Sequence, residues 1–282
     1  MTPDRNSAVS PPVPAPELAA DGLLERPLSA RSVMASLLLG MHPARMRGAL
    51  LVRWCALFGI ASGTARVALH RMAARGELRV ADGRYELAGP LATRQRVQDW
   101  SLDPHLLTWD GRWRLAVVLV GARSAADRQA FRDAMRRLRL VELREGVWLR
   151  PDNLPSEAAP SEAARIVDAQ CQFFGARPDG GDRDTLVARF DPAGWDRRAR
   201  ELTTRLDRAA AAIGGGDDRM LAAGFVTGAA VLGHVRADPL LPDELLSSPS
   251  PAPALRAAYH AYRSAFADAT ARWFARAVET PQ

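Results

Sequence analysis

The residues best suited to a specific chemical task lie in the stretch GIASGTARVALHRMAARGEL, residues 59–78. On a helix, Arg66 and His70 are one turn apart, and Thr64 and Arg71 flank the same side. An arginine fork in the major groove bonds the O6 and N7 of guanine, and a threonine near a helix N-terminus suits a phosphate. This spacing predicts contact between the four side chains and DNA. A solvated helix face is the alternative that the pattern leaves open.

Four further arginines lie close to this stretch in the sequence. Arg79 and Arg84 flank the Asp-Gly tip of an expected hairpin, where they would reach phosphates or the minor groove. The aspartate at the tip would oppose a phosphate. Arg45 and Arg47, at the start of an expected helix, are suited to clamp the DNA backbone. Ordinary surface arginines are the alternative for all four.

The charge of the chain is unevenly distributed. Its formal net charge is +6, and all 38 basic residues are arginine. Residues 28–100 hold 11 arginines against 4 acidic residues, a net +7, whereas residues 1–27 carry −2 and residues 101–282 carry +1. A local basic excess of this kind is the electrostatic footprint of a nucleic-acid-binding module.

The elements around these arginines predict a winged helix-turn-helix. One helix starts near Leu28 and ends before Pro43, and a second covers RMRGALLVRWCALFGI. A third helix, residues 63–75, has Ser62 as its expected N-cap. The following run LRVADGRYEL reads as two strands around Asp82-Gly83, a dipeptide that favours a type I′ turn. The third helix would be the recognition element and the hairpin the wing.

The rest of the chain predicts two more domains. A strand at Trp113–Val120, a helix capped by Ser124, a hairpin in LVELREGVWLRP, a second helix and a strand in CQFFGARP follow the βαββαβ order of a ferredoxin-like domain. The remainder reads as long helices. The expected class is therefore α+β and mostly helical. The expected domains are a disordered lead-in (1–27), the winged helix (28–90), a linker helix (91–108), the ferredoxin-like domain (109–180) and a C-terminal helical domain (185–282).

Three motifs in this order resemble the PaaX family of bacterial transcription regulators. They are the helix-turn-helix stretch above, WDGRWRLAVV followed by GVWLRP, and HVRADPLLPDELL followed by AYHAYRSAF. The resemblance implies a repressor that acts as a homodimer on a palindromic double-stranded operator. It also implies a Cas2-like central domain and release from DNA by an aryl-acyl-coenzyme A thioester.

Two pairs of residues are candidates for binding such an effector. Trp109 and Trp113 bracket DGR ahead of the first central strand, where they would line a pocket or simply pack in the core. His234 and Arg236 precede the DPLLP turn, where they would meet the phosphates or thioester of the ligand. Capping of a helix C-terminus is the alternative for that pair, because positive charge complements the helix dipole there.

Several other functions have little support. The two cysteines and five histidines show no metal-ligand spacing, so we expect Cys55 and Cys171 to be free thiols, with neither a metal nor a cofactor. No apolar run is long enough to span a bilayer, and we expect a cytoplasmic protein.

A Cas2-like nuclease would need an acid at the end of the first central strand, where the sequence reads VLVGARS. We therefore expect no enzyme. A winged helix that binds a partner without reading DNA is a further alternative.

Overall fold

The computed structural model describes two compact units, and the lead-in expected at residues 1–27 lies outside the described residues. The described ranges are 28–121, 124–155, 158, 161–178, 183–215 and 219–279. The first unit contains the described residues up to Arg96 together with 202–231 and those from 257 onward. The second unit contains 97–201 and 232–256. The domain boundaries expected from the sequence remain predictions.

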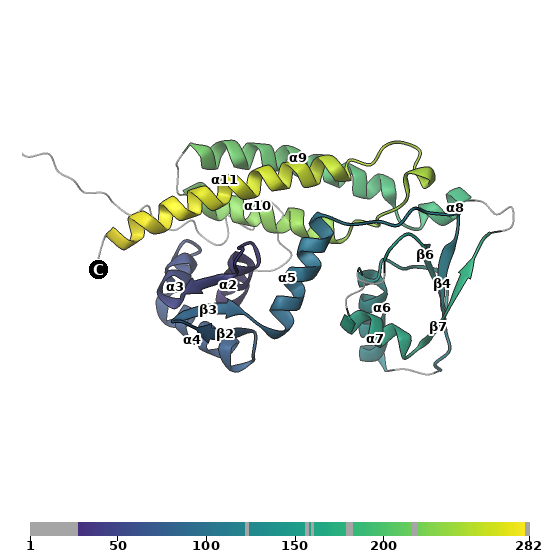
Figure 1. Cartoon of the computed structure of the whole chain (residues 1–282), viewed down its shortest axis with the longest axis horizontal. Helices are drawn as coiled ribbons and strands as arrows, with labels where there is room; N and C mark the ends of the chain where they lie inside the picture. Colours follow the sequence, from purple (N-terminus) through teal and green to yellow (C-terminus); the bar gives the residue numbers. More distant parts are fainter. Residues whose placement is uncertain are drawn as a thin grey trace, which may run out of the picture. The chain divides into compact units, whose positions relative to one another are not determined.

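The first unit begins with the elements of a winged helix-turn-helix (Figure 1). Three helices pack on one another, and three short strands form an antiparallel sheet in the order β1-β3-β2. The structure confirms the mostly helical α+β class. The bounds are α2 Ala30–Leu39, β1 Arg45–Arg47, α3 Gly48–Ala56, α4 Ser62–Ala74, β2 Leu78–Ala81, β3 Arg84–Leu87 and α5 Gly89–Leu102.

Two local expectations were wrong. Arg45 and Arg47 do not start a helix, since they form β1, which pairs with β3 of the wing. Ser62 does not cap α4, because it is the first helical residue and Ala61 occupies the cap position with no side-chain hydrogen bond. By contrast, Ser124 caps α6 (Ala125–Arg137) as expected, accepting a hydrogen bond from the Asp127 amide.

An aromatic cluster fixes α3 within the first unit. Trp54 is fully buried and lies edge-on or tilted to five rings, with ring centroids 5.7 to 6.1 Å away. Phe58 lies in the turn just after α3, and the other four belong to α10 (Arg219–Arg236) and α11 (Ala252–Glu279). These four are Phe225, Phe266, Trp273 and Phe274. The winged helix therefore shares its core with C-terminal helices of the same unit.

The close approach of α10 to its neighbouring helices depends on two glycines. A Cβ added at Gly228 would lie 2.9 Å from a ring carbon of Tyr262, and one at Gly224 would lie 2.5 Å from a methyl group of Ile213 on α9 (Pro192–Gly214). These distances are shorter than real Cβ contacts, so only glycine fits without displacement. Burial raises the pKa of the enclosed Tyr262 hydroxyl well above its usual value.

The second unit contains the ferredoxin-like sheet. Its four antiparallel strands have the order β5-β6-β4-β7, which is the arrangement that the βαββαβ sequence predicts. Helices α6 and α7 cover one face, with Phe131, Met135 and Val167 in the core between them. The bounds are β4 Trp113–Val118, α6 Ala125–Arg137, β5 Val141–Arg144, β6 Val147–Pro151, α7 Ser161–Asp168 and β7 Cys171–Ala176.

The other face of this sheet is covered by segments from farther along the chain. α8 (Arg183–Ala188) and the 3-10 turn η2 (Asp243–Leu245) pack on Trp113 and Leu149. Asp238, in the turn before η2, is almost fully buried and pairs with Arg256 at 2.8 Å. Its backbone carbonyl accepts a hydrogen bond from the Arg139 Nε at 2.9 Å, and burial lowers the pKa of Arg139 to about 10. These contacts hold the DPLLP turn in place.

The Trp54 cluster predicts a large loss of stability on truncation. Trp54→Ala should lower the free energy of unfolding by about 3–5 kcal/mol, because it leaves a cavity among five rings. Trp54→Phe should cost less, about 1–2 kcal/mol, since a ring remains and the buried indole N–H has no hydrogen-bond partner among the described residues. Urea unfolding of the full chain checks this order. Equal, small losses for both variants would contradict the cluster's role.

Candidate nucleic-acid interface

The exposed face of α4 carries every side chain that the sequence placed there. Ala65, Leu69 and Met72 are buried against α2 and α3, and the opposite side of the helix is exposed. We call this side the reading face; it consists of Thr64, Arg66, Val67, His70 and Arg71. Arg66 and Arg71 have no ion-pair partner among the residues that the structure describes. Two cations thus flank an apolar centre at Val67, which is 50% exposed.

The pairing register places the other four predicted arginines on a single face of the small sheet. Glu86 lies opposite both Arg45 and Arg79, and Arg84 lies opposite Arg47. Directly paired residues, and residues two apart on a strand, point to the same side of a sheet. The four arginines therefore share one exposed side, which we call the arginine face. The other side turns Met46, Leu78 and Leu87 into the core.

A carboxylate sits within the arginine face. Glu86 accepts an ion pair from Arg79 at 2.7 Å, with the Glu86 side chain 18% exposed and that of Arg79 70% exposed. This pair neutralises part of the positive charge of the face. Exposed pairs of this kind are weak, about 0–1 kcal/mol, so Arg79 remains able to turn to a competing anion.

The wing tip has the expected geometry. Asp82 and Gly83 have φ values of 49° and 67°, the two positive angles that a type I′ turn requires. A glycine at the second position accepts this conformation at little steric cost. Arg84 directly follows the tip, and the exposed Asp82 stands beside it. The tip therefore presents one cation and one anion to the solvent.

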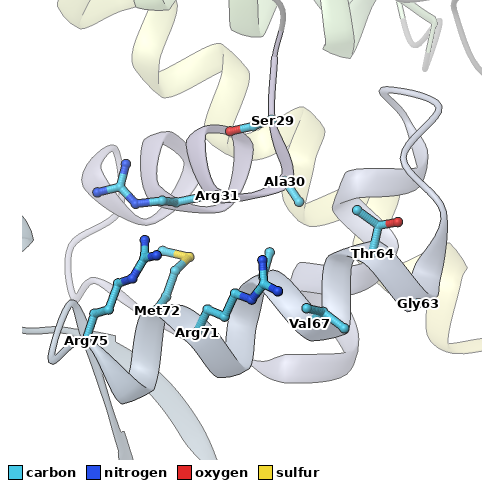
Figure 2. Close-up of a pocket in the computed structure, with 10 residues that line it drawn as sticks. Ser29, Ala30, Arg31, Gly63, Thr64, Val67, Arg71, Met72 and Arg75 are labelled. Atoms are coloured by element: carbon cyan, nitrogen blue, oxygen red, sulfur yellow. The ribbon is translucent and has the colours of Figure 1, made fainter.

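A groove runs between α4 and the first turn of α2 (Figure 2). Its volume is about 460 Å³. Arg31 on its α2 side makes a bidentate ion pair with Glu77, at 2.8 and 3.0 Å, which ties the start of α2 to the residues after α4. The lining residues are Ser29, Ala30, Arg31, Gly63, Thr64, Val67, Ala68, Arg71, Met72 and Arg75. Thr64, Val67 and Arg71 thus belong to both the groove and the reading face.

Trp109 and Trp113 pack against each other in the second unit. Their rings meet edge-on with centroids 6.2 Å apart, and Trp113 is buried in the core over the sheet. The indole of Trp109 donates a hydrogen bond to the Arg112 carbonyl at 2.6 Å. Asp110 forms an ion pair with Arg112 at 2.9 Å, and hydrogen bonds from Arg112 lower the pKa of this carboxyl.

His234 and Arg236 lie in the last turn of α10. The His234 ring stacks on Trp195, with centroids 4.6 Å apart, and its Nε2 lies 3.0 Å from the Trp195 carbonyl. A carbonyl oxygen only accepts hydrogen bonds, so Nε2 carries a proton in this arrangement. Burial lowers the pKa of His234. The histidine therefore has a packing role here, whereas Arg236 is exposed.

A second cavity, of about 260 Å³, lies within the second unit beside the DPLLP turn. Neither this cavity nor the groove along α4 is lined by any of the four residues proposed for the effector. Trp195, Pro239, Leu240 and several other apolar residues form most of the wall. The charged lining residues are Asp196, Asp238, Asp243 and Arg256, and burial raises the pKa of Asp196.

Two residues at the interface, Val67 and Glu86, were not predicted from the sequence. An apolar residue in a helix is usually assigned to the core, so there was no reason to place Val67 at an interface, yet its relative exposure is 50%. Its position 100° from Arg66 on the helical wheel was the available signal. Glu86 was passed over because its neighbours across the strands depend on the pairing register, which distant residues set.

Comparisons with known proteins give matches to both parts of the chain. Residues 29–90 match the family described as PaaX-like protein, and residues 107–188 match the PaaX protein central Cas2-like domain. A solved structure of the uncharacterized protein Rv0674 from Mycobacterium tuberculosis is 36% identical, with a TM-score of 0.66, over 86% of this chain and 98% of that chain. No curated protein matches. In the described part of the chain, no helix combines the length and apolar character needed to cross a membrane.

Proposed function

This chain belongs to the PaaX family of transcription regulators, and on that premise we propose that it binds double-stranded operator DNA through the reading face and the arginine face. The observation that carries the proposal is the pair Arg66 and Arg71, exposed on α4 without ion-pair partners among the described residues. A winged helix places its third helix in the major groove, where arginine forks bond guanine. The predicted contacts Thr64 and His70 lie on the same exposed face.

The two faces would do different work. On the reading face, Arg66 and Arg71 would bond base edges, and the exposed Val67 between them would contact the methyl group of thymine. On the arginine face, Arg45, Arg47 and Arg84 would bond phosphates, which sets affinity and register without reading sequence. Sequence preference would therefore come from α4 and the salt-dependent affinity from the sheet.

We further propose that two copies act together as a repressor. A homodimer would present two α4 helices about 34 Å apart to successive major grooves, which matches a palindromic operator. An effector that binds one conformation better than the other would shift the population away from the DNA-binding form. Repression, as the mode of regulation, is carried over from the family resemblance.

The 260 Å³ cavity in the second unit is the proposed effector site. Its mostly apolar wall suits the hydrophobic part of a small ligand. The one arginine in the wall, Arg256, is already paired with Asp238, and Asp196 and Asp243 add negative charge. The aryl-acyl end of a thioester fits this lining better than the phosphates of coenzyme A. Trp109, Trp113, His234 and Arg236 remain the predicted contacts for the rest of such a ligand.

A nuclease built on the central domain has no support from the strand that would carry it. β4 ends at Val118, and Leu119 and Val120 follow where a magnesium-binding carboxylate would be needed. The matching family is one of regulators. A magnesium-dependent cleavage assay separates the two functions.

The double variant Arg66→Ala/Arg71→Ala tests the reading face. Each arginine contributes about 1–3 kcal/mol if it bonds a base pair, so the variant should lose roughly 30-fold or more in affinity for operator DNA. The measurement is a fluorescence-anisotropy titration with the DNA upstream of the gene. Arg132→Ala/Arg144→Ala removes the same charge from exposed positions of the second unit and is the matched control. Equal affinity for both variants would refute the assignment.

Glu86→Gln tests the arginine face. Removing the carboxylate frees Arg79 and deletes a charge that opposes phosphate, so affinity for any duplex should rise several-fold at low salt. The slope of log affinity against log salt should steepen by about one, the value of one further phosphate contact. Glu142→Gln, an exposed acid on β5, controls for net charge. An unchanged slope would show that Arg79 does not meet the DNA backbone.

A further inference from the structure

The groove along α4 combines an apolar floor with positive charge. Ala30, Val67, Ala68 and Met72 supply apolar surface, and Arg71 on α4 and Arg75 at its C-cap lie beside them (Figure 2). Arg31 is occupied by its bidentate ion pair with Glu77. Arg71 and Arg75 have no ion-pair partner within the described ranges. The groove is therefore complementary to a peptide that carries both acidic and apolar side chains.

The chain contains such a peptide shortly before Ser29, the first residue of the groove in the sequence. Residues 17–25, ELAADGLLE, place Glu17, Asp21 and Glu25 among three leucines and hold no basic residue. Arg26, Pro27 and Leu28 join this stretch to Ser29, which itself lines the groove, and residues 17–27 together carry a net charge of −2 (three acids, one arginine). A chain spans at most about 3.3–3.6 Å per residue, so Glu25 can lie up to about 14 Å from Ser29. Ser29, Arg71 and Arg75 line the same groove, so this tether allows Glu25 to enter the groove that holds both arginines.

We propose that residues 17–27 bind the groove of their own chain and compete with DNA for the reading face. The competition follows from shared residues, since Thr64, Val67 and Arg71 line the groove and also belong to the reading face. A tether this short gives a millimolar effective concentration, so weak contacts suffice to fill the groove. The inference rests on the proposed function, because only a DNA-binding α4 makes this contact inhibitory.

The first experiment does not involve DNA. Phenylglyoxal modifies accessible guanidinium groups, and mass spectrometry of the full chain gives the rate at each arginine. Neutralising the segment with Glu17→Gln/Asp21→Asn/Glu25→Gln should raise the rates at Arg71 and Arg75 several-fold. The rate at Arg66, on the far edge of the reading face, should stay unchanged and serves as the internal reference.

A matched variant and a dilution series complete this experiment. Asp103→Asn/Glu142→Gln/Glu244→Gln changes the net charge equally at exposed positions of the second unit and should leave all three rates unchanged. Equal rates at Arg71 and Arg75 in the wild type and the segment variant would overturn the proposal. Protection that disappears on dilution would assign the groove to the segment of a second copy, and would overturn the intramolecular contact.

The second experiment measures DNA binding by the same full-length proteins. If about one tenth of the molecules have an open groove, neutralising the segment should raise DNA affinity about tenfold, and the matched variant should not. Changed modification rates with unchanged affinity would place the segment in the groove and refute the inhibition. If no protein binds DNA specifically, the proposed function fails, while the modification rates still decide whether the segment fills the groove.

Discussion

The burial of Trp54 is the constraint on which the interface depends. The apolar residues of α3 pack against both α4 and the C-terminal helices of the first unit. Leu51 and Trp54 are fully buried, and five rings enclose the indole. α4 then packs on α3 and α2 through Ala65, Leu69 and Met72, which leaves its opposite side exposed. The direction of the reading face is therefore set by the packing of α4 behind it.

Charge is arranged in two ways over this scaffold. On α4 the cations are few, separated and without partners among the described residues, as suits side chains that would each meet a particular base. On the small sheet the register gathers four arginines on one side and inserts Glu86 among them. In the proposed complex, a carboxylate at this place would weaken non-specific attraction to phosphates, so that α4 would contribute more of the binding energy. If residues 17–27 bind the groove as proposed, their acidic side chains would likewise oppose phosphate at the reading face.

Local patterns were enough to predict much of this fold. The wing follows from Asp82-Gly83 between alternating strands, and the ferredoxin-like order follows from the spacing of strands and helices around Ser124. Arg45 and Arg47 were misplaced because a three-residue strand has no pattern of its own and exists only through pairing with β3. The apolar stripe of α3 was visible in the sequence, but its partners Phe225 and Phe266 lie more than 170 residues away.

The candidate site was predictable to the same degree. Helical spacing was enough to put Arg66, His70 and Arg71 on one exposed side of α4. It gave no reason to expect Val67 at the centre, or an ion pair between Arg79 and Glu86, because exposure and register are set by the tertiary structure. The packing of His234 was not predictable either, because it stacks on Trp195, 39 residues away in the sequence, and no spacing rule connects the two.

The central claim is that α4 reads DNA sequence, and a selection from random duplexes with the purified full-length protein tests it most directly. The account predicts enrichment of an inverted repeat whose half-sites are about one helical turn, or 10–10.5 base pairs, apart, or a multiple of this. Each half-site should contain guanines on either side of a thymine, in keeping with Arg66 and Arg71 flanking Val67. Recovery of sequences with no preference beyond the starting pool would contradict it.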